Sequence, residues 1–326
     1  MNKFVFTCGD INGIGPEIVI KALNKITQNP KDKFIFICPA NVFDKNSKII
    51  KPKFEFNYSD FKEEKFDSKV TVLDYGYFKQ KIGYPTIDSG RAAFLSIKKS
   101  FELTSNKIAD AVITAPISKL AINMSGEKFA GHTEMYAKWC GINNFVMTFL
   151  SEKMNAALAT IHEPIKRVPV LITKELIIKK IEIIISALKN DLKIAFPKVA
   201  VLGLNPHAGE NGLIGVEEKE ILIPIITNKI YSKILDGPFS PDAFFANHLY
   251  KNYDLVLGMY HDQVLIPFKQ INFGGGVNFT AGLPIVRTSP DHGTAFDIAG
   301  EGKASESSII QAFNYAKKIV LNRKRI

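Results

Sequence analysis

The alternation of short, β-rich apolar runs with helical patterns is the feature that most constrains the fold of this chain. Strands that alternate with helices are typical of α/β proteins with a largely parallel sheet. The expected strands are Lys3–Cys8, Lys33–Cys38, Val70–Leu73, Ala109–Thr114, Phe145–Leu150, Asn155–Ile161, Val199–Leu204 and Asp254–Met259. The expected helices are Pro16–Ile26, Ser89–Leu103, Lys174–Lys189, Val216–Asn228 and a terminal helix over Ser305–Leu321. The pattern therefore predicts an α/β fold.

The length of the chain predicts two lobes. A chain of 326 residues exceeds the roughly 100–200 residues of one compact domain. No change in composition marks a boundary, so the two lobes are expected to be interwoven in sequence. The lysine-rich stretch Asp44–Lys69 is expected to form an exposed excursion.

Composition argues against a membrane protein or a secreted protein. Hydrophobic residues make up 46% of the chain and charged residues 23%, which is the balance of an ordinary globular protein. No apolar run approaches the roughly 18 residues of a membrane-spanning helix, and the run Phe4–Cys8 is too short for a signal peptide. Three cysteines without C-x-x-C spacing argue against a disulfide framework or a zinc ribbon. We therefore expect a cytoplasmic protein.

The formal net charge of +10 raises the question of nucleic-acid binding. Only five of the 42 basic residues are arginine, and the lysines are scattered along the chain. Nucleic-acid binders usually concentrate their charge in a patch and favour arginine at phosphate contacts. We expect no nucleic-acid partner, and we read the charge as steering for a small anionic substrate.

Loops rich in Gly, Pro, His and Asp follow several of the expected strands. They cover residues 9–17, 114–119, 131–134, 205–212, 258–263 and 287–295. Because ligands of open α/β folds bind at the carboxyl ends of strands, we expect the functional residues in these loops. The glycines Gly9, Gly13 and Gly15 do not fit G-x-G-x-x-G, and the sequence contains no P-loop.

Five of the six histidines lie in or beside such loops. The sixth, His248, falls in the helical stretch Phe244–Tyr250 and is expected to be structural. His162, His207 and His261 each follow a β-rich run closely, so they can converge at one sheet edge and hold a divalent metal with open positions for substrate. Their spacing matches no local metal motif, so each can equally be a hydrogen-bonded loop histidine.

Taken together, the loops are similar to those of the 4-hydroxythreonine-4-phosphate dehydrogenase (PdxA) family. Residues 9–18 resemble the family's G-D-P-A-G-I-G-P-E-I, with Ile11 and Asn12 in place of Pro-Ala. Residues 204–212 resemble L-N-P-H-A-G-E-x-G, and residues 260–263 resemble Y-H-D-Q. The resemblance covers the chain from Gly9 to about Gly300, and its blocks occur in the family's order.

This resemblance implies the fold and most of the site. It implies the two-lobed fold of isocitrate and isopropylmalate dehydrogenases, with mostly parallel sheets and with the C-terminus returning to the first lobe. The first lobe, on the cofactor side, is expected over residues 1–128 plus 282–326, and the second, on the metal and dimer side, over 129–281. The implied metal ligands are His162, His207 and His261; the implied substrate contacts are His132, Thr133, Lys269, Asn278 and Arg287; and Asp242 and Asp262 fall at acidic positions near the metal.

The same family implies a homodimer with its active site beside the subunit interface, and one divalent metal per subunit. Three neutral imidazoles suit zinc best, while magnesium or cobalt also fits a site that takes substrate oxygens. Asp262 is expected to accept a proton, to orient the neighbouring ligand, or only to cap its loop.

A further likeness concerns the cofactor. Residues 291–300 resemble the H-G-S-A-P-D-I-A-G loop with which isocitrate and isopropylmalate dehydrogenases hold the adenine side of their cofactor. The expected cofactor contacts here are Gly293, Thr294, Ala295 and Asp297. The cofactor is NAD or NADP, and NAD is favoured because residues 291–302 contain no lysine or arginine to bind a 2′-phosphate.

The activity implied is oxidation of 4-phosphohydroxy-L-threonine to a 3-oxo acid that loses carbon dioxide, in vitamin B6 biosynthesis. One alternative is a sister dehydrogenase of a phosphorylated four-carbon sugar acid such as 4-phosphothreonate. Another, of a different class, is an acyl-phosphate transferase such as phosphotransacetylase. The three-histidine set and the segment Gly293–Gly300 argue against the transferase.

Overall fold

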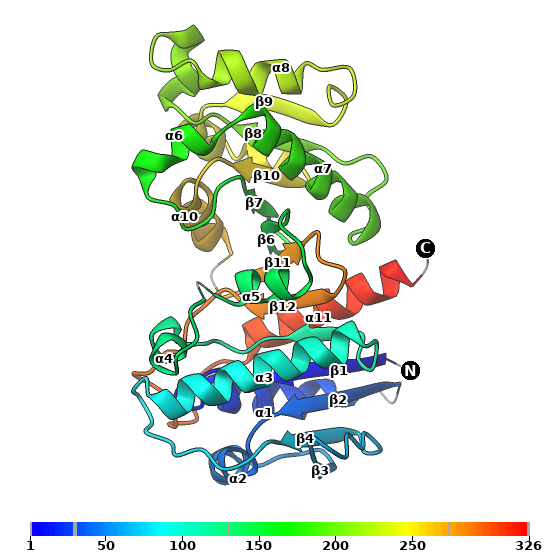
Figure 1. The fold of residues 1–326 in the computed structure, drawn as a ribbon. Helices are drawn as coiled ribbons and strands as arrows, with labels where there is room; N and C mark the ends of the chain where they lie inside the picture. The colour runs from blue at the N-terminus through cyan, green and yellow to red at the C-terminus, as the bar shows by residue number, and fades with distance from the viewer. Residues whose placement is uncertain (1, 29–30, 130, 273, 325–326) are drawn as a thin grey trace. The chain divides into compact units, whose positions relative to one another are not determined.

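The computed structural model describes residues 2–28, 31–129, 131–272 and 274–324. They form two compact units (Figure 1). The first comprises Met1–Ile142 and Leu283–Val320, and the second comprises Asn143–Gly282 and Leu321–Ile326. The sequence predicted a second lobe that begins at residue 129, whereas the second unit begins at Asn143.

The first unit is built on a parallel sheet. Its strands lie in the order β3-β4-β2-β1-β5-β12, and each neighbouring pair is parallel. Their bounds are β1 Asn2–Thr7, β2 Asp32–Ile37, β3 Phe56–Asp60, β4 Val70–Asp74, β5 Ala111–Ile113 and β12 Val286–Pro290. The helices are α1 Gly15–Ile26, α2 Ala40–Ile49, α3 Ile87–Ser105, α4 Lys119–Met124, α5 His132–Trp139 and most of α11 Ser307–Arg323. Strand β1 is apolar and buried in its centre, as expected of a parallel sheet whose faces are covered by helices.

The second unit is a mixed sheet with a parallel half. Its strands lie in the order β11-β6-β7-β10-β8-β9; β7, β10, β8 and β9 are parallel to one another, whereas β6 is antiparallel to both β11 and β7. Their bounds are β6 Val146–Leu150, β7 Ala156–Leu158, β8 Val199–Leu202, β9 Leu235–Phe239, β10 Leu255–Gly258 and β11 Val277–Ala281. The helices are α6 Val168–Leu171, α7 Lys174–Asn190, α8 Ile223–Ile226, α9 Pro241–Ala246 and α10 His261–Ile271. Other helical turns are η1 Ile165–Arg167, η2 Pro206–Gly212, η3 Glu218–Leu222 and η4 Leu249–Asn252.

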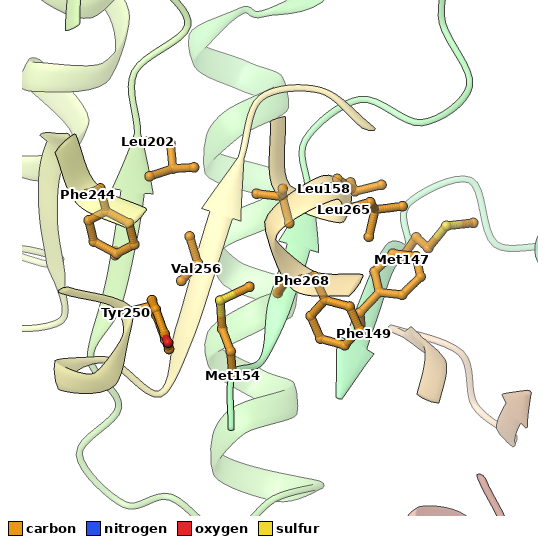
Figure 2. Packing of buried hydrophobic residues seen from close by; sticks show 13 residues of the cluster. Met147, Phe149, Met154, Leu158, Leu202, Phe244, Tyr250, Val256, Leu265 and Phe268 are labelled. Carbon is orange, nitrogen blue, oxygen red and sulfur yellow. The ribbon is translucent and has the colours of Figure 1, made fainter. Parts of the chain in front are cut away.

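A hydrophobic cluster fixes α10 against this sheet (Figure 2). Phe268 of α10 is fully buried, and its ring centroid lies 5.6 Å from that of Phe149 on β6. Val256 of β10 and Leu158 of β7 belong to the same cluster. Because α10 begins at His261, this packing also sets the position of a candidate metal ligand.

The predicted class, a mostly parallel α/β fold, is confirmed. Strands β3, β9, β11 and β12 were not predicted from the sequence. The stretch Asp44–Lys69, expected to be an exposed excursion, contains the end of α2 and the whole of β3. The expected helix Val216–Asn228 is interrupted, because it consists of the π-helical turn η3 followed by the short α8. Within the described residues, no helix combines the length and apolar character needed to span a membrane.

Candidate active site

The parallel half of the second unit carries three of the predicted histidines at one edge. Strands β7, β10, β8 and β9 are neighbours in that order, so their carboxyl ends lie along the same edge. His162 follows β7, His261 follows β10 and His207 follows β8. Asp242, in the first turn of α9, follows β9.

His162 and His261 lie side by side. Their ring centroids are 5.8 Å apart. Nδ1 of His261 is 2.7 Å from Oδ1 of Asp262, and this hydrogen bond orients the imidazole. The two histidines and Asp262 border a cavity of about 340 Å³, whose other lining residues are Glu163, Pro164, Ile165 and Tyr260.

His207 lies on a left-handed turn. The backbone φ angles of the five residues from His207 to Asn211 are 51°, 50°, 80°, 43° and 57°. For each residue other than glycine, this conformation costs about 1–2 kcal/mol. Such strain persists only where surrounding contacts enforce it, and it is concentrated at functional sites. The turn therefore indicates a functional role for this loop.

Asp242, in the first turn of α9, lies near His207. The hydroxyl of Ser240 donates a hydrogen bond to the Asp242 carboxylate at 2.5 Å. This bond, the backbone N–H of Ala243 and the His207 side chain together hold the pKa of Asp242 below its ordinary value. Asp242 is therefore a carboxylate at neutral pH.

The imidazoles suit a divalent metal in kind, since neutral histidine nitrogens are common ligands of zinc and related ions. In the part of the chain that the structure describes, however, no group of three His, Cys, Asp or Glu side chains is close enough to hold an ion. The three histidines thus follow adjacent strands at one edge of the sheet, and their binding of one shared ion stays a prediction.

Lys269 and Asn278 belong to the same unit. Lys269 is exposed on α10, about 12 Å along the helix axis from His261. Asn278 is on β11, and its Oδ1 is a buried oxygen with no hydrogen-bond partner among the described residues. A buried polar atom without a partner is rare in proteins, and a ligand that donates a hydrogen bond would satisfy it.

The remaining predicted substrate residues form a cluster in the first unit. Arg287 of β12 is only 2% exposed. Its Nη2 donates to the hydroxyl of Thr114 at 2.7 Å, and its Nη1 donates to the hydroxyl of Thr133 at 3.4 Å. Burial lowers the pKa of Arg287 to about 10, so the guanidinium is still charged at neutral pH. A buried cation bonded to neutral hydroxyls favours an anionic ligand.

His132, at the start of α5, belongs to this cluster. Burial lowers its pKa well below the ordinary value, and the nearby cations Arg287 and Lys119 lower it further. The imidazole is therefore neutral at neutral pH. Its Nε2 is buried without a hydrogen-bond partner among the described residues, so it can donate to or accept from a ligand.

The expected cofactor loop packs against the glycine-rich loop after β1. The N–H of Ile14 donates to the carbonyl oxygen of Thr294 at 3.0 Å. A Cβ at Gly13 would lie 2.8 Å from that same oxygen, so only glycine permits this approach. A Cβ at Gly293 would meet no atom within 4 Å, and Asp297 is exposed, so this side of the loop is open to a ligand.

Asn12 joins the Lys81–Tyr84 segment to the glycine-rich loop after β1. Its Oδ1 accepts from the N–H of Lys81 at 2.8 Å, and its Nδ2 donates to the carbonyl oxygen of Tyr84 at 2.8 Å. Its own carbonyl oxygen accepts from the N–H of Gly83 at 2.9 Å. In the sequence, Asn12 is only a departure from the family's pattern. Its hydrogen bonds between the loop after β1 and the Lys81–Tyr84 segment were not predicted.

The chain is similar to known proteins over nearly its whole length. Residues 30–316 match the family described as pyridoxal phosphate biosynthetic protein PdxA. The 4-hydroxythreonine-4-phosphate dehydrogenase of Prosthecochloris aestuarii is 39% identical over 333 residues, which cover 99% of this chain and 98% of that protein. A protein of Oceanobacillus iheyensis, proposed to be a D-threonate 4-phosphate dehydrogenase, is 36% identical over 317 residues and 95% of each chain. The crystal structure of the Klebsiella pneumoniae 4-hydroxythreonine-4-phosphate dehydrogenase has a TM-score of 0.82 at 32% identity, over 98% of this chain and all of that chain.

The fold, the loops and these relatives define an oxidoreductase of the dehydrogenase class. More closely, the chain belongs to the PdxA family of pyridoxal phosphate biosynthetic proteins. This membership confirms the resemblance drawn from the loops of the sequence.

The buried carboxyl of Asp10, in the loop after β1, predicts a pH-dependent stability. Burial raises its pKa from 3.8 to about 6, although it accepts hydrogen bonds from Asn12 and Ser89. The folded state therefore binds the proton more tightly than the unfolded state, and stability is lost as the pH rises from about 4 through 6. We expect Asp10→Asn to raise the free energy of unfolding at pH 8 by about 2–3 kcal/mol, and by almost nothing at pH 4.

The measurement is urea unfolding of both proteins from pH 4 to pH 8. Asp297→Asn, at an exposed carboxyl, is the control and should show no such rise. A difference between wild type and Asp10→Asn that stays constant over this range would contradict the prediction.

Proposed function

We propose that the protein catalyses the NAD(P)- and divalent-metal-dependent oxidation of 4-phosphohydroxy-L-threonine. The product is 2-amino-3-oxo-4-phosphohydroxybutanoate, which decarboxylates to 3-amino-2-oxopropyl phosphate in pyridoxal phosphate biosynthesis. The observation that carries the proposal is the succession of His162, His261 and His207 after three adjacent parallel strands. The names of the relatives support the substrate.

The cluster around Arg287 supports binding of an anionic group. A phosphate or carboxylate would accept charge-assisted hydrogen bonds from the buried guanidinium and further bonds from Thr133 and the neutral His132. Lys269 and Asn278 are also proposed to bind polar groups of the substrate. The buried, unpartnered Oδ1 of Asn278 suits the ammonium group of the amino acid.

His162, His207 and His261 would hold the metal. A divalent ion, of which zinc, magnesium and cobalt are the candidates, lowers the pKa of a bound alcohol and stabilises the negative charge that develops on its oxygen. Asp262 keeps His261 in one orientation through the bond to Nδ1, which leaves Nε2 for the metal. Asp262 is also proposed as the acceptor of the proton that the substrate's alcohol would lose on oxidation, and Asp242, a carboxylate near His207, is proposed as a second acidic residue of the site.

A second candidate substrate is 4-phosphothreonate, which lacks the amine. The Oceanobacillus iheyensis relative supports this alternative. The two substrates share the phosphate, the carboxylate and the secondary alcohol, so the cluster around Arg287 suits both. Asn278 is the residue proposed to distinguish them.

We expect NADH formation from 4-phosphohydroxy-L-threonine with a kcat/KM at least about tenfold above that for 4-phosphothreonate, which corresponds to about 1.4 kcal/mol. A chelator should abolish the activity. His207→Ala should lose both bound metal and turnover while the protein stays folded, because one of the three imidazoles is gone. The measurements are initial rates, metal content and the circular dichroism spectrum.

His248→Ala is the matched control, because His248 lies between α9 and η4, with its ring centroid 5.9 Å from that of Tyr250. Its φ of 53° places it outside the helix in which the sequence predicted it. It should keep metal and rate. A His207→Ala protein with full metal content and a near-normal rate would refute the metal assignment, and a preference for 4-phosphothreonate would refute the substrate.

We also propose a homodimer that forms at the histidine-bearing face of the second unit. The segments that carry the histidines expose apolar side chains: Leu213 is 86% exposed, Val170 79%, Ile165 65% and Ile266 58%. Such exposure is costly in water and is typical of an interface. The active site would then lie beside the partner subunit.

We expect sedimentation equilibrium to give a dimer at assay concentrations. Leu213→Glu should shift the equilibrium toward the monomer, since the carboxylate would be buried at the interface. Phe196→Glu, at a side chain 92% exposed on the segment before β8, is the control and should leave the dimer intact. An active monomer in wild type would contradict the proposal.

NAD is proposed as the better cofactor. Asp297 and Glu301 on the cofactor loop are exposed and disfavour a 2′-phosphate. The Lys81–Tyr84 segment, which Asn12 joins to the loop after β1, carries one cation, Lys81. Its ammonium lies 4.9 Å from the centroid of the Tyr84 ring.

We expect a higher kcat/KM with NAD than with NADP. In Lys81→Ala, the kcat/KM for NAD divided by that for NADP should change little. Initial rates with both cofactors measure it. A clear preference for NADP that Lys81→Ala removes would reverse the assignment and identify Lys81 as the phosphate-binding residue.

A further inference from the structure

Glu218 is a buried carboxylate that has no role in the proposed reaction. It is 2% exposed and begins the π-helical turn η3. Its Oε1 accepts from the backbone N–H groups of Leu204 and Asn205, both at 2.7 Å. Its Oε2 accepts from Nδ2 of Asn205 at 2.9 Å. All of these hydrogen bonds go to the short segment that precedes His207.

Gln263 of α10, which follows the neighbouring strand β10, also binds the segment before His207. It lies in the first turn of α10, two residues after His261. Its Oε1 accepts from the N–H of Met259 at 2.7 Å, and its Nε2 donates to the carbonyl oxygen of Gly203 at 2.7 Å. One side chain therefore joins the loop that carries His261 to the end of β8.

The connection continues to the loop of His162. The hydroxyl of Thr160 donates to the carbonyl oxygen of Met259 at 2.7 Å. Hydrogen bonds therefore run from Thr160 through Met259 and Gln263 to Gly203, and from Leu204 and Asn205 to Glu218. They cross the edge on which the three histidines follow their strands.

The left-handed turn folds back over Glu218. A Cβ at Gly209, within the turn, would lie 2.6 Å from Oε2 of Glu218. A Cβ at Gly203 would lie 2.9 Å from Cα of Ala208. The turn therefore has no space to shift toward the carboxylate, and its placement depends on where Glu218 and Gln263 hold the residues before it.

We propose that Glu218 and Gln263 are positioning residues, which fix the His207 turn relative to His261 by binding the Gly203–Asn205 segment from opposite sides. Neither side chain touches substrate or metal. The inference rests on the proposed function, because it assumes that His207 and His261 bind one metal ion.

The test is titration of the metal-free protein with Co²⁺, followed by the visible absorption of the ion and by calorimetry. Glu218→Gln removes the charge and one acceptor, and Gln263→Glu removes the donor to Gly203. In each variant we expect the Kd for Co²⁺ to rise about 10–100-fold, with an altered absorption band, as is typical when groups that orient metal ligands are changed. Glu220→Gln and Gln270→Glu, at exposed positions on the same two elements, are the matched controls and should bind Co²⁺ as wild type does.

The thermal midpoint of each variant separates positioning from simple destabilisation. A lowered midpoint with the wild-type Kd and absorption band in both variants would overturn the positioning role. His207→Ala, titrated alongside, separates this inference from the proposed function. Unchanged Co²⁺ binding in His207→Ala refutes the metal assignment and the inference with it, whereas lost binding there with wild-type binding in Glu218→Gln and Gln263→Glu refutes the inference alone.

Discussion

Parallel pairing of β7, β10, β8 and β9 is the constraint on which the proposed metal site depends. Parallel strands point their carboxyl ends the same way, so loops that are far apart in sequence start from one edge. β7, β10 and β8 are short and buried, and α10 packs against this sheet through Phe268. Loops that start from a packed sheet can carry strained conformations such as the His207 turn, because the sheet supplies the stability that the loops lack.

In the first unit, the corresponding constraint is electrostatic. A guanidinium buried as deeply as that of Arg287 loses its hydration, and the hydroxyls of Thr114 and Thr133 replace only part of it. The same desolvation keeps His132 neutral beside a cation. Burial therefore underlies both the preference of this cluster for anions and, with the nearby cations, the neutral state of its histidine.

The sequence predicted the fold class because the apolar runs of β1, β2 and β10 alternate with helical patterns. It did not predict β12, in which buried Arg287 and Thr288 interrupt the apolar pattern, or β9, in which Asp236-Gly237-Pro238 reads as a turn. The candidate ligands could be selected from the loops that contain them. From the sequence, the three histidines could be placed at one sheet edge only as one possibility, because the strand order β7-β10-β8 is not the order of the chain. Glu218 gave no signal, since in sequence it is one acidic residue within the charged stretch Glu217–Glu220.

Asn12 has a consequence for the thermodynamics of ligand binding. Its hydrogen bonds hold the loop after β1 and the Lys81–Tyr84 segment together, and Ile14 of the same loop bonds to Thr294. A ligand that binds to loops which are already ordered does not have to offset the entropy of ordering them. These intramolecular hydrogen bonds order the three segments during folding, so a ligand that binds to them retains more of its contact energy as affinity.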